Sequence, residues 1–188
     1  MEIFPEHDLR TPRMRLRWLT EDDAPRLVAL HGDPDVMRFL GDGRPVPPAE
    51  VLGRTLPVML ARHGHRNLLG YRAAEDAATG DFLGWFELVP AGRGRRGEVE
   101  LGYRLFPSAW GRGYATEGSR ALVRAAFTVC GAERVMGTTM AVNTASRRVM
   151  EKAGLRYVRT FFEEWPDPVE GAEQGDVEYA LERDDWRA

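Results

Sequence analysis

A strand, a glycine-rich turn and a long helix, joined without a gap, limit the fold more than any other feature of the sequence. Apolar and polar residues alternate over residues 98–106, which predicts a strand with one buried face, and Pro107 ends it. After the turn at 110–113, a helix is predicted from Ala115 to Gly131. The apolar stripe of that helix is Leu122, Val123, Ala126, Phe127 and Cys130. Such a unit indicates a sheet covered by helices.

The rest of the chain adds strands and helices around this unit. Further strands are expected at 14–18, 67–75, 82–89, 134–140, 157–163 and 177–182. Helices are expected from Pro25 to His31, after Pro34, from Val51 to an end at His63-Gly64 with a kink at Pro57, and from Asn143 to Gly154. No repeat or linker divides the 188 residues. The sequence therefore predicts one α/β (α+β) domain over residues 1–188, with a mixed sheet and helices on both faces.

Charge and composition restrict the partners. The 26 basic and 29 acidic side chains give a net charge of −3, which does not favour a polyanion, so no nucleic-acid partner is expected. A nucleic-acid module built on Arg93, Arg95 and Arg96 is a distant alternative. No signal segment and no apolar run of about 18 residues is present, so we expect a cytoplasmic protein without a membrane partner.

Three motifs are set aside. Gly92-Arg-Gly-Arg-Arg-Gly97 matches a dinucleotide-binding pattern, but it precedes a strand rather than a helix, which favours a hairpin tip. The four histidines are His7, His31, His63 and His65, and one close pair without further ligands predicts no metal site. The single cysteine, Cys130, lies on the apolar stripe of the long helix, as a structural residue would.

The segment Trp110-Gly-Arg-Gly-Tyr-Ala-Thr-Glu117 is a better candidate for chemistry. Gly111 and Gly113 permit backbone conformations in which successive amides converge on an anion, and the helix dipole adds to this. Arg112 supplies a positive charge, so phosphates suit this turn. A glycine-rich turn that merely starts a helix is the equal alternative from these residues alone.

Three blocks of sequence resemble the GCN5-related N-acetyltransferases, and within them the branch similar to the ribosomal-protein alanine acetyltransferases (RimJ/RimL-like). The blocks are Glu100-Leu-Gly-Tyr103 with Pro107, Trp110 to Glu117, and Asn143-Thr-Ala-Ser-Arg-Arg-Val-Met-Glu-Lys-Ala-Gly154. The opening residues 9–17, Glu21-Asp-Asp23 and Asp33-Pro34 resemble this branch too. The resemblance implies a mostly antiparallel sheet of six to seven strands whose fourth and fifth strands splay apart. It implies acetyl-CoA as cosubstrate in that opening, and no metal.

The resemblance also implies where acetyl-CoA binds. Its pyrophosphate is expected on the amides from Arg112 to Thr116, and its pantetheine on backbone groups of Leu105 and Phe106 that the splay leaves unpaired. The expected set is Leu105, Phe106, Trp110, Gly111, Arg112, Gly113, Tyr114, Ala115, Thr116, Asn143 and Ser146. Trp110 stands where the broad family has Gln or Arg, but the closer branch tolerates Trp.

Transfer of an acetyl group to an amine needs a proton acceptor for the ammonium and a proton donor for the departing thiolate. Glu100 is the expected acceptor, and a surface carboxylate paired with Arg104 is the alternative. Ser146 is the expected donor, and Asn143 is expected to hold pantetheine or a water. The alternative for these two is a helix cap and a solvent-facing hydroxyl.

Substrate choice has the weakest signal. Met37, Phe39 and Trp85 are expected to line an acceptor cleft together with Arg38 and Trp165, and aromatic core packing is an equal alternative. The sequence predicts an acetyl-CoA-dependent N-acetyltransferase that acts by direct attack of a primary amine, first a protein or peptide amino terminus. A small amine such as a polyamine or aminoglycoside is the second hypothesis, and a non-catalytic acyl-CoA-binding module the third. A monomer or a homodimer is expected.

Overall fold

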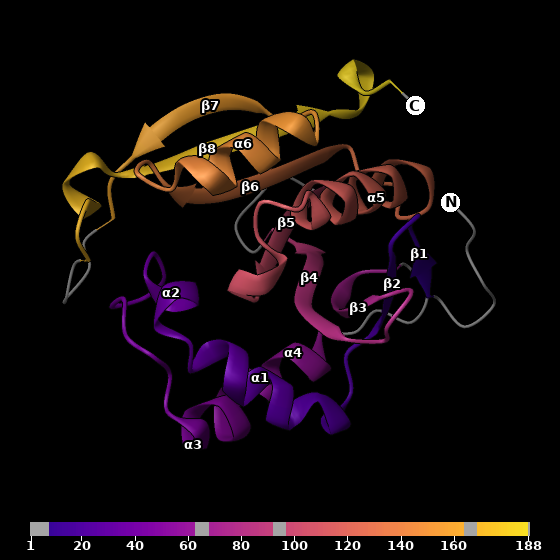
Figure 1. Cartoon of the computed structure of the whole chain (residues 1–188). Coiled ribbons are helices and arrows are strands. Elements are labelled where there is room, and N and C mark those ends of the chain that lie inside the picture. The colour runs from indigo at the N-terminus through magenta and orange to yellow at the C-terminus, as the bar shows by residue number, and fades with distance from the viewer. Residues whose placement is uncertain (1–7, 63–67, 92–96, 164–168, 188) are drawn as a thin grey trace.

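One sheet of eight strands runs through the molecule in the order β1-β2-β3-β4-β5-β6-β8-β7. The structure is a computed structural model that describes residues 8–62, 68–91, 97–163 and 169–187 (Figure 1). The strands are β1 (Leu9–Arg10), β2 (Met14–Trp18), β3 (Gly70–Asp76), β4 (Phe82–Pro90), β5 (Glu98–Leu105), β6 (Arg134–Met140), β7 (Arg156–Phe161) and β8 (Asp176–Glu182). Neighbouring strands are antiparallel except for β5 and β6.

Helices cover both faces of the sheet, as predicted. The helices are α1 (Ala24–His31), α2 (Pro34–Met37), α3 (Pro48–Glu50), α4 (Leu56–Ala61), α5 (Tyr114–Thr128) and α6 (Thr144–Lys152). In Figure 1, α1 to α4 gather on one side, with α1 against β4 and α4 against β3, while α5 and α6 lie on the other side. The α/β class of a single-sheet domain with helices on both faces is therefore confirmed.

Two details differ from the sequence-based expectation. The sheet has eight strands instead of six to seven, because the two-residue strand β1 pairs with β2 and is too short to show a periodicity. The expected helix from Val51 to His63-Gly64 is divided into α3, a π-helical segment Val51–Thr55, and α4. Pro57 is the second residue of α4, directly after the π-helical segment, so the helical hydrogen-bond pattern changes next to the residue that has no N–H.

The parallel pair β5/β6 is short. Register partners run only from Glu98 with Arg134 to Glu100 with Met136, whereas β5 continues to Leu105 and β6 to Met140. The two strands therefore separate beyond Glu100, which confirms the expected splay. This separation places a V-shaped interruption in the middle of an otherwise continuous sheet.

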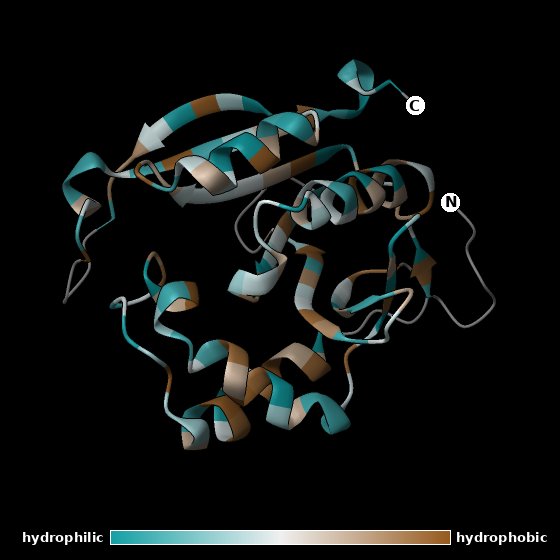
Figure 2. Ribbon diagram, viewed as in Figure 1, coloured by the Kyte–Doolittle hydropathy of each residue, from teal (hydrophilic) through white to brown (hydrophobic). Residues whose placement is uncertain are grey.

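Two apolar clusters fill the layers on either side of the sheet. Helix α5 packs so closely on β4 that a Cβ at Gly118 would lie 2.3 Å from the Phe86 ring. On the other face, Leu27 and Leu30 of α1 pack with Tyr71 and Trp85. Figure 2 shows hydrophobic and hydrophilic residues mixed along α1 and α5, as expected for helices with one buried side.

Some predicted features lie outside the described residues. These are His7, His63, His65, Trp165, the arginines Arg93, Arg95 and Arg96, and the hairpin tip except for Gly97. Within residues 8–62, 68–91, 97–163 and 169–187, no helix is long and apolar enough to cross a membrane. No three His, Cys, Asp or Glu side chains in those residues are grouped as a metal site would require.

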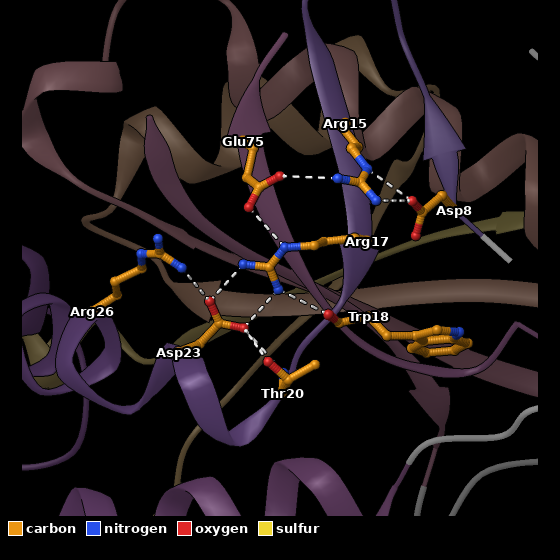
Figure 3. Close-up of polar contacts among 8 residues, drawn as sticks. All are labelled: Asp8, Arg15, Arg17, Trp18, Thr20, Asp23, Arg26 and Glu75. Atoms are coloured by element: carbon orange, nitrogen blue, oxygen red, sulfur yellow. Dashed lines mark hydrogen bonds and ion pairs between the residues drawn. The ribbon is translucent and has the colours of Figure 1, made fainter. Parts of the chain in front are cut away.

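A buried ion-pair network joins α1 to the sheet (Figure 3). Asp23 is fully buried, and its carboxylate accepts two hydrogen bonds from the Arg17 guanidinium, at 2.6 and 2.7 Å. Arg26 and the backbone N–H of Thr20 also donate to Asp23, while Arg17 donates to Glu75 of β3. Burial alone would raise the pKa of Asp23, but these donors and their charges together lower it.

We expect Asp23→Asn to lower the free energy of unfolding by about 2–4 kcal/mol at neutral pH, because it leaves the partly buried Arg17 without its bidentate partner. The pKa of Asp23 is lower when folded, so its stabilisation is present at neutral pH and lost as pH falls through the folded pKa. Urea unfolding at pH 7 and in acid measures this. The neighbouring exposed Asp22→Asn is the control, and equal losses in both variants would contradict the prediction.

Candidate active site

The two faces of β5 carry different chemistry at the point where it leaves β6. Glu100, Gly102 and Arg104 belong to one face, on which Arg104 contacts His31 of α1. Tyr103 belongs to the opposite face, where its hydroxyl contacts Ser146 of α6. The alternation of a strand thus separates a charged face toward α1 to α4 from a hydroxyl-bearing face toward α5 and α6.

The glycine-rich turn before α5 has the backbone that the sequence predicted. Gly111 and Gly113 have φ of 69° and 83°, in the left-handed region that favours glycine, and Gly113 is the N-cap of α5. The first N–H groups of a helix have no acceptor within the helix, and the dipole makes this end positive. The loop and the first turn of α5 therefore fit a phosphate group, as expected for Arg112 to Thr116.

Contacts from the first hairpin brace this turn. Arg13 Nη1 donates to the carbonyl of Arg112 at 2.8 Å, and Arg13 Nε donates to Glu117 at 2.7 Å. The hydroxyl of Thr11 also donates to Glu117, at 2.6 Å. The Tyr114 hydroxyl donates to Asp76 at 2.6 Å, so its side chain anchors the loop to the end of β3. The shape of the turn is thus fixed by residues far away in the sequence.

The expectation that Leu105 and Phe106 have unpaired backbone groups is wrong for two atoms. Phe106 N–H donates to the carbonyl of Leu83 at 2.9 Å, because the antiparallel pairing with β4 extends past Leu105. The Leu105 carbonyl faces away from β4, but it accepts a hydrogen bond from Trp110 Nε1 at 2.8 Å. The Trp110 side chain is 48% exposed and rests on the strand that was expected to receive pantetheine.

Ser146 and Asn143 lie on the first turn of α6. The Ser146 hydroxyl is 2.9 Å from the Tyr103 hydroxyl, and burial raises the pKa of Tyr103 to about 12, with the bond to Ser146 opposing the rise. Asn143 accepts from the Ser146 backbone N–H at 3.1 Å and donates to Thr139 at 3.1 Å. The helix-cap alternative for Asn143 is confirmed, whereas Ser146 is paired with Tyr103, a partner that the sequence did not predict.

A second carboxylate, Glu87, lies beside Glu100. Tyr71, Glu87 and Gly102 are register partners across β3, β4 and β5. A Cβ at Gly102 would lie 2.3 Å from Glu87 Oε1, so the carboxylate occupies the space that a side chain would need. Burial raises the pKa of Glu87 to about 7; the hydrogen bond with Tyr71 opposes the rise and Glu100 adds to it. Glu87 therefore titrates near neutral pH.

The Glu100 carboxylate is not paired with Arg104. Burial raises the pKa of Glu100, and the charge of Arg62 opposes that rise. Arg104 Nη1 instead lies 3.1 Å from His31 Nδ1, and the guanidinium lies 5.2 Å from the centre of the Trp85 ring. The alternative of a surface Glu100–Arg104 pair is therefore wrong, because Arg104 turns toward α1.

The sequence matches the family model described as acetyltransferase (GNAT) domain over residues 13–156. The chain belongs to the GNAT acetyltransferase family. The FsC-acetyl coenzyme A-N(2)-transacetylase of Aspergillus fumigatus is 35% identical over 192 residues, covering 99% of this chain and 80% of the relative.

Solved GNAT structures share the fold. An acetyltransferase from Bacillus anthracis superposes with a TM-score of 0.77 at 18% identity, covering 94% of this chain and 99% of that one. Spermidine N-acetyltransferase from Vibrio cholerae, solved with CoA and spermine, gives 0.74 at 18% identity, covering 92% and 96%.

A cavity of about 370 Å³ opens on the charged face of this GNAT domain. Its lining residues are His31, Arg54, Thr55, Val58, Met59, Tyr71, Trp85, Glu87 and Arg104. Of the three expected acceptor residues, Trp85 lines the cavity. Met37 lies behind the wall, where its sulfur accepts from Arg104 at 3.4 Å, and Phe39 lies against the Arg38 guanidinium.

The sequence reasoning missed Glu87, Tyr103 and His31 as site residues. Glu87 had a signal, since it is the only charged residue in the apolar stretch of residues 82–89. Tyr103 was assigned to the apolar face, which is correct, but nothing in the sequence showed that Ser146 would meet it.

We expect Glu87→Gln to gain stability relative to the unaltered protein as pH rises from 5 to 8. The folded carboxyl has a raised pKa, so its favourable neutral form is lost as pH rises through about 7, whereas glutamine stays neutral. The difference should grow by about 1–3 kcal/mol in urea unfolding at the two pH values. The exposed Glu21→Gln is the control. A difference that is the same at both pH values would contradict the assignment.

Proposed function

We propose that this acetyltransferase moves the acetyl group of acetyl-CoA to a primary amine of a small molecule, by direct attack in a ternary complex. The observation that carries the proposal is the division of the sheet at β5: Glu100 of β5 and Glu87 of the neighbouring β4 lie on one face, and the contact between Tyr103 of β5 and Ser146 of α6 lies on the other. A proton acceptor for the amine and a proton donor for the thiolate are thus available on opposite sides of one opening.

Acetyl-CoA, when bound, supplies the acetyl group as a thioester. The residues that would hold it are those of the loop before α5, whose backbone geometry fits a pyrophosphate. The indole N–H of Trp110 already donates a hydrogen bond to the Leu105 carbonyl. When acetyl-CoA binds, this indole would therefore move aside or pack against the pantetheine. Asn143 already caps α6, which leaves Ser146 as the side chain of that turn directed at β5.

The chain's own residues account for both proton movements. Glu100, beside the point of separation, takes a proton from the ammonium, and Glu87 is the neighbouring carboxylate that shares this role. The amine nitrogen then bonds to the acetyl carbon while the carbon–sulfur bond breaks. Ser146 Oγ gives a proton to the departing thiolate and regains one from Tyr103 through their 2.9 Å hydrogen bond. The nitrogen loses its second proton to solvent as the amide forms, and solvent returns a proton to Tyr103.

A covalent acetyl-enzyme is not part of the proposal. Burial raises the pKa of Cys130, the single cysteine, to about 11, with Arg72 opposing the rise. A thiol with that pKa is a poor nucleophile at neutral pH. Direct attack therefore fits this site better than a two-step transfer through cysteine.

The cavity favours a small acceptor over a protein amino terminus. About 370 Å³ is at the lower end of the range for small-molecule pockets, and its walls come from α1, α4 and three strands. The name of the Aspergillus relative, an acetyl coenzyme A N(2)-transacetylase, supports N-acetylation. Membership of the ribosomal-protein branch remains a hypothesis, and a peptide amino terminus is the competing acceptor in a thiol-release screen.

Replacement of two glycines separates acetyl-CoA binding from backbone strain. Gly111 and Gly131 have φ of 69° and 70°, and a Cβ at either would meet no atom within 4 Å. Gly111→Ala and Gly131→Ala should each cost about 1 kcal/mol of stability. Only Gly111→Ala should weaken acetyl-CoA binding in calorimetry.

For the unaltered protein, acetyl-CoA at about 100 times its Kd should add roughly 2.7 kcal/mol to stability. No shift at millimolar acetyl-CoA would overturn the proposal.

We expect Glu100→Gln and Ser146→Ala to lower kcat at least tenfold while the Kd of acetyl-CoA stays unchanged, because each removes a proton-transfer group. Tyr103→Phe should have a smaller effect, since water can reload Ser146. Release of free thiol measures kcat, and the exposed Glu133→Gln is the control. Full activity in both main variants would show that the assigned roles are wrong.

A further inference from the structure

Arg104 is a partly buried cation whose hydrogen bonding the protein satisfies only in part. Its Nη1 lies 3.1 Å from His31 Nδ1 and donates to the sulfur of Met37 at 3.4 Å, and the Trp85 ring lies beneath it. Its Nε is buried and has no hydrogen-bond partner among the described residues. All these direct contacts are with neutral groups. A guanidinium in such a place costs free energy unless something completes its set of acceptors.

The groups around Arg104 do not neutralise it. His31 accepts a hydrogen bond from Trp85 Nε1 at 3.2 Å, and burial lowers the pKa of His31 to about 3, with the charge of Arg104 adding to this. His31 is therefore a neutral neighbour. The negative charge of Glu87, in the adjacent row of the sheet, favours the charged form of Arg104. That carboxylate is itself engaged with Tyr71 and is partly protonated near neutral pH.

The cavity brings this cation and the carboxylate of Glu87 together. Arg104 and Glu87 both line it, and they lie on neighbouring same-face rows, since Trp85 pairs with Arg104 and Glu87 with Gly102. Rows two residues apart are separated by roughly 7 Å along a strand. Arg54 lines the opposite, helical wall of the cavity. A ligand in this space therefore meets a negative end and a positive end a few ångströms apart.

We propose that the acceptor is a primary amine that also carries a carboxylate, with its amine at Glu87 and Glu100 and its carboxylate on the Arg104 guanidinium. The terminal nitrogens of the guanidinium can donate to the oxygens of one carboxylate, whereas the buried Nε stays out of its reach. This contact gives Arg104 an anionic partner and turns the amine toward the opening between β5 and β6. The inference rests on the proposed function and names the substrate class within it.

The test compares amines that differ only in charge. L-Ornithine and L-lysine are each paired with their amides, which keep both amino groups and remove the carboxylate, and putrescine and cadaverine extend the series. With acetyl-CoA and thiol release as the readout, we expect kcat/KM to be at least tenfold higher for the carboxylates. Peptides and aminoglycosides complete the panel.

Arg104→Gln links the preference to this residue. We expect the variant to lose the preference through a higher KM for the amino acids, while its KM for acetyl-CoA and its use of the amides stay close to those of the unaltered protein. The exposed Arg124→Gln, on the opposite face, is the control. If Arg104→Gln does not fold, as judged by thermal unfolding, the comparison of amines on the unaltered protein still tests whether the acceptor carries a carboxylate.

Three results would contradict the proposals, and they have different meanings. Equal or higher kcat/KM for the amides and diamines would overturn the carboxylate inference and leave N-acetylation standing. No thiol release with any amine of the panel would overturn the proposed function, and this inference with it. A carboxylate preference that persists in a folded Arg104→Gln variant would also overturn the assignment.

Discussion

The short parallel contact between β5 and β6 is the constraint on which the site depends. The register holds these strands together only up to Glu100 and Met136. Beyond that point each strand keeps its outer neighbour, since β5 stays paired with β4 and β6 with β8. The sheet is therefore continuous where β5 and β6 begin and is open toward the ends of these two strands. A ligand can reach backbone and side chains there without the loss of either half of the sheet.

The opening brings different chemical groups together because a strand directs successive side chains to opposite faces. Glu100 and Tyr103 are three residues apart on β5, so Glu100 belongs to the face toward α1 to α4 and Tyr103 faces α6. Gly102 between them makes room for Glu87 from the next strand. Two carboxylates and a hydroxyl pair thus surround one gap, and each pKa is raised by burial.

The early helices make this arrangement selective. They form the outer wall of the cavity, and α1 is held to the sheet by the bidentate Arg17–Asp23 pair. The same helix carries His31, which meets Trp85 and Arg104 at the cavity floor. The ion pair at one end of α1 and the proposed acceptor site at its other end therefore depend on the same docking of this helix against β2 and β4.

Local sequence determined much of this protein. The alternation in β5, the positive-φ glycines of the loop and the N-cap of α6 depend on residues near one another in the chain, so their patterns could be interpreted directly. The resemblance of three motifs to one family then supplied the splayed sheet. These signals were sufficient for the fold class, for the glycine-rich loop as a candidate phosphate site, and for Glu100 and Ser146 as candidate site residues.

Only the tertiary structure decided which side chains meet. Glu87 reaches the site because Gly102 lies opposite it in the register, and Tyr103 meets Ser146 because α6 packs against β5. Arg104 turned from Glu100 to His31, and Trp110 covered the Leu105 carbonyl. Strand register and helix docking join residues that are distant in the sequence, and no local pattern encodes those distances. The sequence thus determined which groups were present, and the packing of α1 and α6 on the sheet determined their partners.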